Sequence, residues 1–314
     1  MGRAAWETAR VGRAAWETAR EGAPERGTRG GWSRADPPPA VRPRETRARR
    51  ISFPVRPPST RTPVPHFYTE PVVSVLARPV FQEPPHLPVH WLGEGTDGER
   101  LAEFAGRLCY MSQKNPAERS TRDYIDNIKK QGHGSVLEHA NYSLLIEGIS
   151  RSLTHELVRH RAGFAYSQLS QRYVDESDAA FVVPPAIQGD DALVAQWKQQ
   201  VESAQATYVA LVEKLMERYS WVDSKVHRRK MAREAARGVL PNSTETKIVA
   251  TANVRGWRTM LELRTSEGAE MEIRRCAVMI LRTLQKEAPG FFSDFEIYMA
   301  ADRVESARVG YHKV

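Results

Sequence analysis

The chain has 314 residues, of which 41% are hydrophobic and 27% are charged, and its formal net charge is +8. It contains no run of 18 apolar residues, which excludes an ordinary transmembrane helix. The first 65 residues hold 14 arginines, no lysine and 6 acidic residues, so residues 66–314 carry 32 charges of each sign. This neutral balance argues against a basic nucleic-acid-binding surface on the part of the chain that can fold.

Residues 1–65 are predicted to be a disordered, Arg/Pro-rich N-terminal extension, and residues 66–314 a single domain. The extension holds half of the 20 prolines and few apolar side chains, so it cannot bury enough surface to offset its ordering entropy. A nine-residue unit, Gly2 to Arg10, recurs from Gly12 to Arg20, but two copies do not make a repeat fold. An upstream-start artefact would explain such an extension, and an arm attracted to RNA or membranes is the alternative.

Acidic residues in the extension, such as Glu7 and Glu17, disfavour a transit peptide, and no signal-peptide core is present. A soluble, cytoplasmic protein that does not enter a membrane is therefore expected. The two cysteines, Cys109 and Cys276, form no C-x-x-C pair and predict no disulfide framework. Both fall in segments of apolar periodicity, so each is predicted to be a buried small hydrophobe rather than a reactive thiol.

Apolar patterns predict strands and helices at uneven intervals along the rest of the chain. Strands are expected at 72–81, 141–149 and 244–252. Helices are expected at 96–110, 120–131, 190–219, 226–238, 254–263 and 270–287. This order favours an α+β fold with a central mixed or antiparallel sheet flanked by helices. No G-x-G-x-x-G segment occurs, so no Rossmann motif is expected to hold a dinucleotide.

The most informative segment is the basic triplet Arg159-His160-Arg161 and the polar stretch 167–173, with sequence SQLSQRY. Apolar residues at 153, 157 and 158 predict a helix that ends in the triplet, stopped by Ala162-Gly163 and followed by a polar loop. Guanidinium forks beside hydroxyls and amides suit a ligand with phosphates and a heterocycle edge. For the triplet alone, a basic helix end that complements its own dipole is the alternative.

A zinc site is weighed at the same place because His155-Glu156 precedes His160. The zinc signature H-E-x-x-H needs its two histidines four residues apart, so that they lie about 40° from each other around a helix. Here they are five residues apart, which turns the second imidazole about 140° away from the first. No metal site is therefore predicted.

Two further segments have a shape suited to ligand contact. Residues 132–135, with sequence GHGS, form a glycine-flanked polar turn in which the backbone can approach a ligand, although a plain connection is the alternative. Asn253 stands where a strand is expected to end and a helix to begin, and helix capping alone would explain it.

The triplet, with Ser170 and Arg172 downstream, resembles the signature of flavin-dependent thymidylate synthases. Eight residues separate the triplet from Ser170, one more than the family pattern has. Residues 236–241 resemble the family's ARxxLP segment, and Arg264 follows Asn253 at the family's spacing of eleven residues. The resemblance spans roughly residues 72–298, implies the fold of that family, and makes 66–314 the catalytic domain.

The resemblance also implies roles for individual residues. Expected flavin contacts are His133, Ser135, Arg159, His160, Arg161, Gln168, Asn253, Val254, Arg255 and Thr259, the last standing where relatives carry Asn or His. Expected nucleotide contacts are Glu156, Leu157, Val158, Arg159, Gln168, Leu169, Ser170, Gln171, Arg172, Arg237 and Arg264. No cysteine lies near these segments in sequence, so uracil is expected to be activated electrostatically, with Arg264 as the catalytic residue and Arg237 sharing its role.

The implied reaction is reductive methylation of dUMP to dTMP, with methylenetetrahydrofolate as carbon donor and NADPH as reductant through FAD. The implied assembly is a homotetramer with shared active sites. A folate-dependent hydroxymethyl transfer to a pyrimidine nucleotide, without the flavin reduction step, is one alternative. A protein that binds nucleic acid through its basic extension is another, and it predicts salt-sensitive binding that disappears without residues 1–65.

Overall fold

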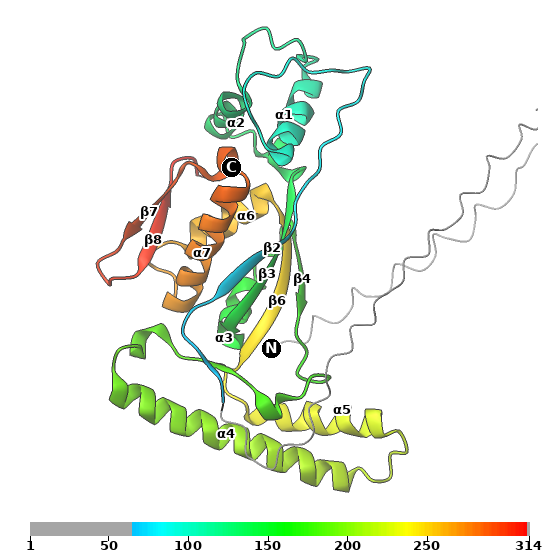
Figure 1. The fold of residues 1–314 in the computed structure, drawn as a ribbon, viewed down its shortest axis with the longest axis vertical. Helices are drawn as coiled ribbons and strands as arrows, with labels where there is room; N and C mark the ends of the chain where they lie inside the picture. Colours follow the sequence, from blue (N-terminus) through cyan, green and yellow to red (C-terminus); the bar gives the residue numbers. More distant parts are fainter. Residues whose placement is uncertain (1–64, 313–314) are drawn as a thin grey trace, which may run out of the picture. The chain divides into compact units, whose positions relative to one another are not determined.

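A computed structural model describes residues 65–312, which all belong to one compact unit. Four strands form an antiparallel sheet in the order β2-β3-β6-β4 (Figure 1). They are β2 (Val72–Ala77), β3 (Asn141–Ser150), β6 (Glu245–Asn253) and β4 (Phe164–Gln168). The three predicted strands are confirmed, and the first ends at Ala77, shortly before Pro79.

Strand β4 corrects the polar loop that was expected after the basic triplet. It pairs with β6 from Phe164 opposite Ala252 to Gln168 opposite Ile248, and it forms one edge of the sheet. Its side chains alternate between half-buried and exposed, with Tyr166 on the half-buried side. The alternation is obscured in the sequence, because Ala165 is apolar on the exposed side and Gln168 is polar on the half-buried side.

One face of the sheet packs against three helices, α3 (Arg151–Leu157), α6 (Val254–Arg264) and α7 (Met271–Glu287). Strand residues such as Leu144 and Ala250 are fully buried in the core that these helices share. A side chain of the size of Leu144 contributes about 1.5–3 kcal/mol when it leaves water. Trp257 of α6 is also fully buried, and its Nε1 donates to the Tyr142 carbonyl oxygen at 3.2 Å.

Helices α1 (Asp97–Cys109) and α2 (Thr121–Lys130) lie within the predicted ranges, and both begin at capped residues. Thr96 forms a capping box with Glu99, and the Ser120 hydroxyl accepts from the Asp123 amide. The 3-10 turn η1 (Gly134–Glu138) packs against α1 and α6. Cys276 is buried as predicted, but the prediction for Cys109 is wrong: it is the last residue of α1 and it is exposed.

Helices α4 (Asp191–Arg218) and α5 (Lys225–Ala236) pack against each other beside the start of β6 (Figure 1). The short elements that the sequence did not indicate include two hairpin strands, β7 (Phe295–Met299) and β8 (Glu305–Val309). The others are β1 (Phe67–Tyr68), β5 (Phe181–Val182), α8 (Pro289–Phe292), η2 (Glu176–Asp178), η3 (Pro185–Ile187) and η4 (Arg237–Val239).

The predicted extension, residues 1–65, lies outside the described residues apart from its last residue, so its disorder stays a prediction. Between residues 65 and 312, no helix is both long enough and apolar enough to cross a membrane. Over the same range, no three His, Cys, Asp or Glu side chains are grouped so that they could hold a metal ion.

Candidate active site

The basic triplet lies in a tight connection between α3 and β4. Helix α3 ends at Leu157, earlier than predicted, because the amides of Arg159 and His160 bond to carbonyl oxygens three residues back rather than four. The Tyr166 hydroxyl lies 2.9 Å from the Leu157 carbonyl oxygen and 3.0 Å from that of His160. A residue from the half-buried side of β4 therefore fixes the backbone of the triplet.

Gly163 brings this connection against the end of β6. Its φ is +74°, a conformation that suits glycine. A Cβ on Gly163 would also lie 2.9 Å from the Asn253 side-chain nitrogen, so no other residue fits without displacing Asn253. Asn253 caps α6, since its Oδ1 accepts from the Gly256 amide at 2.8 Å. The capping explanation for Asn253 is thus confirmed.

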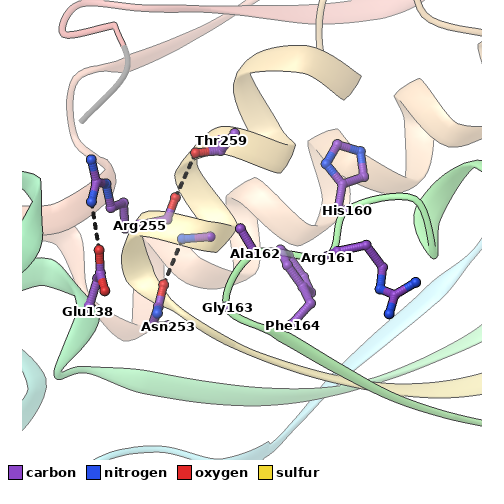
Figure 2. A pocket seen from close by; sticks show the side chains of 10 residues that line it. Glu138, His160, Arg161, Ala162, Gly163, Phe164, Asn253, Arg255 and Thr259 are labelled. Atoms are coloured by element: carbon purple, nitrogen blue, oxygen red, sulfur yellow. Dashed lines mark hydrogen bonds and ion pairs between the residues drawn. The ribbon is translucent and has the colours of Figure 1, made fainter. Parts of the chain in front are cut away.

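A cavity of about 320 Å³ lies where the α3–β4 connection meets the first turn of α6 (Figure 2). Five predicted flavin contacts line it together, namely His160, Arg161, Asn253, Arg255 and Thr259. The other lining residues are Glu138, Ala162, Gly163, Phe164 and Gly256. Arg255 forms an ion pair of 2.6 Å with Glu138, and the Thr259 hydroxyl donates to the Arg255 carbonyl oxygen at 3.0 Å.

Arg264, the predicted catalytic residue, is held beside this cavity by two partners. Its Nε donates to His160 Nε2 at 3.0 Å, and its Nη1 forms an ion pair of 2.7 Å with Glu156. Burial, with the nearby Arg264 charge, lowers the pKa of His160 to about 4. The imidazole is therefore neutral near pH 7, accepts through Nε2 and carries its proton on Nδ1.

His133 and Ser135 line a second cavity of about 350 Å³, formed by α1, α2 and η1. Arg255 borders both cavities, so the two groups of predicted flavin contacts meet at this side chain. Cys109 also lines the second cavity, and this corrects the expectation that no cysteine lies near the site. The proximity arises from the packing of α1 against η1, which sequence spacing does not reveal.

The polar stretch after β4 lies at the other end of the sheet. The Leu169 amide donates to the Lys247 carbonyl oxygen near the start of β6, whereas Asn253 ends that strand. The nine residues of β6 span about 26 Å at the usual strand rise. Ser170 and Arg172 are therefore separated, within one chain, from the cavity that Asn253 lines.

Several of the predicted nucleotide contacts are buried or form hydrogen bonds or ion pairs with other residues of the same chain. Gln168 donates to the hydroxyls of Thr154 and Thr246, and Gln171 is only 5% exposed. Arg172 is half-buried and its Nε lies 3.3 Å from Glu234 of α5. Arg237, at the start of η4, is near enough to Arg151 for its charge to lower the pKa of that guanidinium, although burial is the larger cause.

Comparison with known proteins identifies the family. The family described as thymidylate synthase complementing protein (Thy1) matches residues 92–290. Flavin-dependent thymidylate synthases from Mycobacteroides abscessus and Mycobacterium avium are 47% and 48% identical over 237 residues, which are 75% of this chain and 94% of each relative. The chain belongs to this family. The predicted family is thus confirmed, and this family member is an enzyme.

A solved structure shares the fold of this family member. The UMP/dUMP methylase PolB from Streptomyces cacaoi, solved with 5-Br dUMP, is 21% identical with a TM-score of 0.54. The match covers 73% of this chain and 95% of that one, and at this identity it shows the fold alone. The predicted α+β class with its antiparallel sheet is confirmed. All of the predicted site residues lie within the family match, which spans 92–290.

Three residues that line or support the site, but do not belong to the family signature, are not predicted by the sequence analysis. Glu138 lines the first cavity and pairs with Arg255, and Phe164 lines it beside His160. Tyr166 fixes the triplet. Phe164 and Tyr166 stand two apart beside small or polar residues, which is a strand signal that could have located the last two. Glu138 could be found only from the packing of η1 on α6.

Proposed function

We propose that this enzyme converts dUMP to dTMP by reductive methylation, with methylenetetrahydrofolate as carbon donor and NADPH as reductant through FAD. The observation that supports the proposal most is the convergence of the triplet and the Asn253–Arg255 junction on one cavity, with Arg264 held beside it. These segments lie far apart in the chain, and only the family fold brings them together.

The residues present suit an FAD molecule. Two cationic side chains, Arg161 and Arg255, line the first cavity at the N-terminus of α6, where a phosphate is stabilised. Phe164 in the first cavity and Tyr124 in the second provide aromatic surface for flat rings. FAD would be held by the predicted flavin contacts that line the two cavities, and when bound it would supply hydride transfer.

Arg264 is proposed to stabilise negative charge on the uracil. Two of the five N–H donors of an arginine are occupied here by His160 and Glu156, which leaves the others for the base edge. Such a donor favours ionisation at N3 or enolate character at O4, and either makes C5 more nucleophilic. Glu156 to Arg159 would orient the base from the same side.

The nucleotide phosphate is proposed to bind Ser170 and Arg172 with the amides of residues 168–172, and Arg237 would approach the pyrimidine nucleotide. These residues lie toward the end of the sheet opposite the cavity: the Leu169 amide bonds to the Lys247 carbonyl oxygen, six residues or about 20 Å along β6 from Asn253. This separation supports the proposed homotetramer, in which one subunit's cavity faces another subunit's 170–172 segment.

The test is to purify the protein and follow its flavin spectrum. Bound flavin should bleach with NADPH and reoxidise when dUMP and methylenetetrahydrofolate are added, and the nucleotide product should be dTMP. A hydroxymethylated product, formed without any change in flavin absorbance, would overturn the proposal in favour of the transferase alternative.

A further inference from the structure

The segment that follows β4 needs an external anchor. Residues 169–175 belong to no helix or strand, and Tyr173, Val174 and Asp175 are exposed. Their internal backbone bonds are few: the amides of Tyr173 and Val174 both donate to the Ser170 carbonyl oxygen. A segment with so few bonds does not fix the direction of Ser170 and Arg172 by itself.

Arg233 of α5 supplies such an anchor. Its Nη1 donates to the Tyr173 carbonyl oxygen at 2.7 Å, and its Nη2 forms an ion pair of 2.5 Å with Asp175. Arg233 is 9% exposed, so its guanidinium is largely buried, whereas the Asp175 carboxylate remains open to solvent. A planar guanidinium can satisfy two acceptors in fixed geometry, which lysine cannot do.

The same helix holds the side chain of Arg172 and presents Arg237. Glu234 lies 3.3 Å from the Arg172 Nε, and Arg237 follows Arg233 by four residues, one turn along. Helix α5 itself packs against the long helix α4. The end of α5 therefore ties the backbone of the 170–175 segment, the Arg172 guanidinium and Arg237 to one rigid element.

We propose that Arg233 is a positioning residue that sets the affinity of the enzyme for the nucleotide phosphate without touching it. The inference rests on the proposed function, because it is that function which puts a phosphate on Ser170 and Arg172. Loss of the clamp formed by Arg233, Tyr173 and Asp175 would leave the cavity for the flavin intact, because that cavity lies at the other end of β6.

The test compares Arg233→Gln, Arg233→Lys and a matched control, Arg228→Gln. Arg228 lies on the same helix and also donates to backbone carbonyls, those of Ser220 and Val222, but not to the 170–175 segment. Arg233→Gln should raise KM for dUMP about tenfold and Kd for dUMP equally, since a charge-assisted bond is lost. Turnover at saturating dUMP and dUMP-independent flavin reduction should change less than twofold. Arg233→Lys should lie between, and Arg228→Gln should match wild type.

Asp175→Asn tests the clamp from its other side. Asp175 is half-exposed, and asparagine can keep the Oδ1 acceptor that caps the Ser177 amide, so this variant should fold. It should raise KM for dUMP as Arg233→Gln does, and the double variant should be no worse than Arg233→Gln alone. Unchanged dUMP affinity in either folded variant would overturn the clamp alone. A wild-type enzyme that binds no dUMP would overturn the proposed function, and the clamp with it.

Discussion

His160 and Arg264 form a pair in which only the arginine is charged. Burial and the neighbouring guanidinium lower the pKa of His160 to about 4, so the ring remains a neutral acceptor over the physiological range. Arg264 is therefore oriented by a hydrogen bond on Nε and by the Glu156 carboxylate on Nη1. Two fixed contacts on one planar group leave its remaining donors in a defined direction.

Arg264→Lys should therefore reduce activity strongly although it keeps the charge. A lysine ammonium cannot bond His160 and Glu156 while it also addresses two atoms of the base. We expect dUMP-dependent oxidation of the reduced flavin to slow about 100-fold, as when one donor to a developing anion is removed. NADPH-driven flavin reduction should be nearly unchanged, because it does not ionise the uracil. Both half-reactions can be followed by stopped flow.

Arg282→Lys is the control for that experiment, since Arg282 pairs with Glu305 and neither residue lines either cavity. If Arg264→Lys slows both half-reactions equally, or loses bound FAD, then Arg264 holds the flavin or the fold and is not the group that activates uracil.

The ionised form of the buried Glu176 carboxyl is poorly stabilised by its surroundings. It is 5% exposed, and burial raises its pKa to about 7 against the opposing charges of Arg151 and Arg233. A carboxyl with a raised pKa in the folded state stabilises the fold most at low pH. That contribution is lost as the pH rises through about 7, and it amounts to something on the order of 3 kcal/mol.

Glu176→Gln should remove this dependence. We expect the variant to gain stability relative to wild type at pH 8 and to lose that advantage at pH 5, where the wild-type carboxyl is protonated. Urea unfolding at the two pH values measures the difference. The exposed Glu213→Gln on α4 serves as control and should leave the pH profile unchanged. A profile for Glu176→Gln parallel to that of wild type would show that Glu176 is not the group responsible.

Strand β4 is the element that joins the two halves of the candidate site. The triplet directly precedes the strand at the cavity end, and Ser170 follows the strand at its other end. Gly163, just before the strand, is needed both for its positive φ and for the close approach of Asn253. Gly189 also has a positive φ, but no atom lies within 4 Å of a Cβ placed there. Substitutions at these two glycines therefore distinguish the effect of backbone strain, which both share, from the effect of a contact with Asn253, which only Gly163 has.

Gly163→Ala and Gly189→Ala should thus lose similar amounts of stability but differ in their affinity for FAD. Both should lose about 1 kcal/mol or more of stability because alanine disfavours a positive φ. Only Gly163→Ala should displace Asn253 and weaken FAD binding, which fluorescence titration of the apoprotein would detect. Equal FAD affinity in the two variants would mean that the contact between Gly163 and Asn253 does not shape the cavity.

Elements with strong local signals could be predicted from the sequence. The capped starts of α1 and α2 and the apolar periods of β3 and β6 are such signals, and their ends agree within a few residues. The strands β4, β7 and β8 are missed by the sequence analysis, because five residues give only a short period, which in β4 consists of Phe164 and Tyr166 alone. Strands of two residues, such as β1, depend entirely on their partner.

At the scale of the whole molecule, the signature residues could be predicted but their arrangement could not. The sequence places Arg161 and Arg172 eleven residues apart, and a strand carries them to opposite ends of the sheet. Conversely, Cys109 and Arg255 are distant in sequence and border one cavity. Chain order does not encode such distances, because they arise from the pairing of β4 with β6 and from the packing of α1 on η1.

The separation of the two ends predicts complementation between inactive variants. Arg255→Ala should abolish activity because it damages the cavity, and Arg172→Ala because it removes a proposed contact to the nucleotide phosphate. If each site takes its cavity from one subunit and its 170–172 segment from another, random mixing of the two variants restores about a quarter of the sites. Co-expression with two different tags and purification of the mixed oligomer would measure the recovered dTMP synthesis.

The matched control mixes Arg255→Ala with Arg161→Ala. These two residues line the same cavity of one chain, so every cavity in the mixed oligomer carries one defect, and no activity should return. Recovery in the first mixture but not in the second would assign the two ends of the sheet to different subunits within one site. No recovery in either mixture, from oligomers shown to contain both tags, would mean that each site is built from a single chain. In that case the 170–172 segment would have to reach the cavity by a rearrangement of β4.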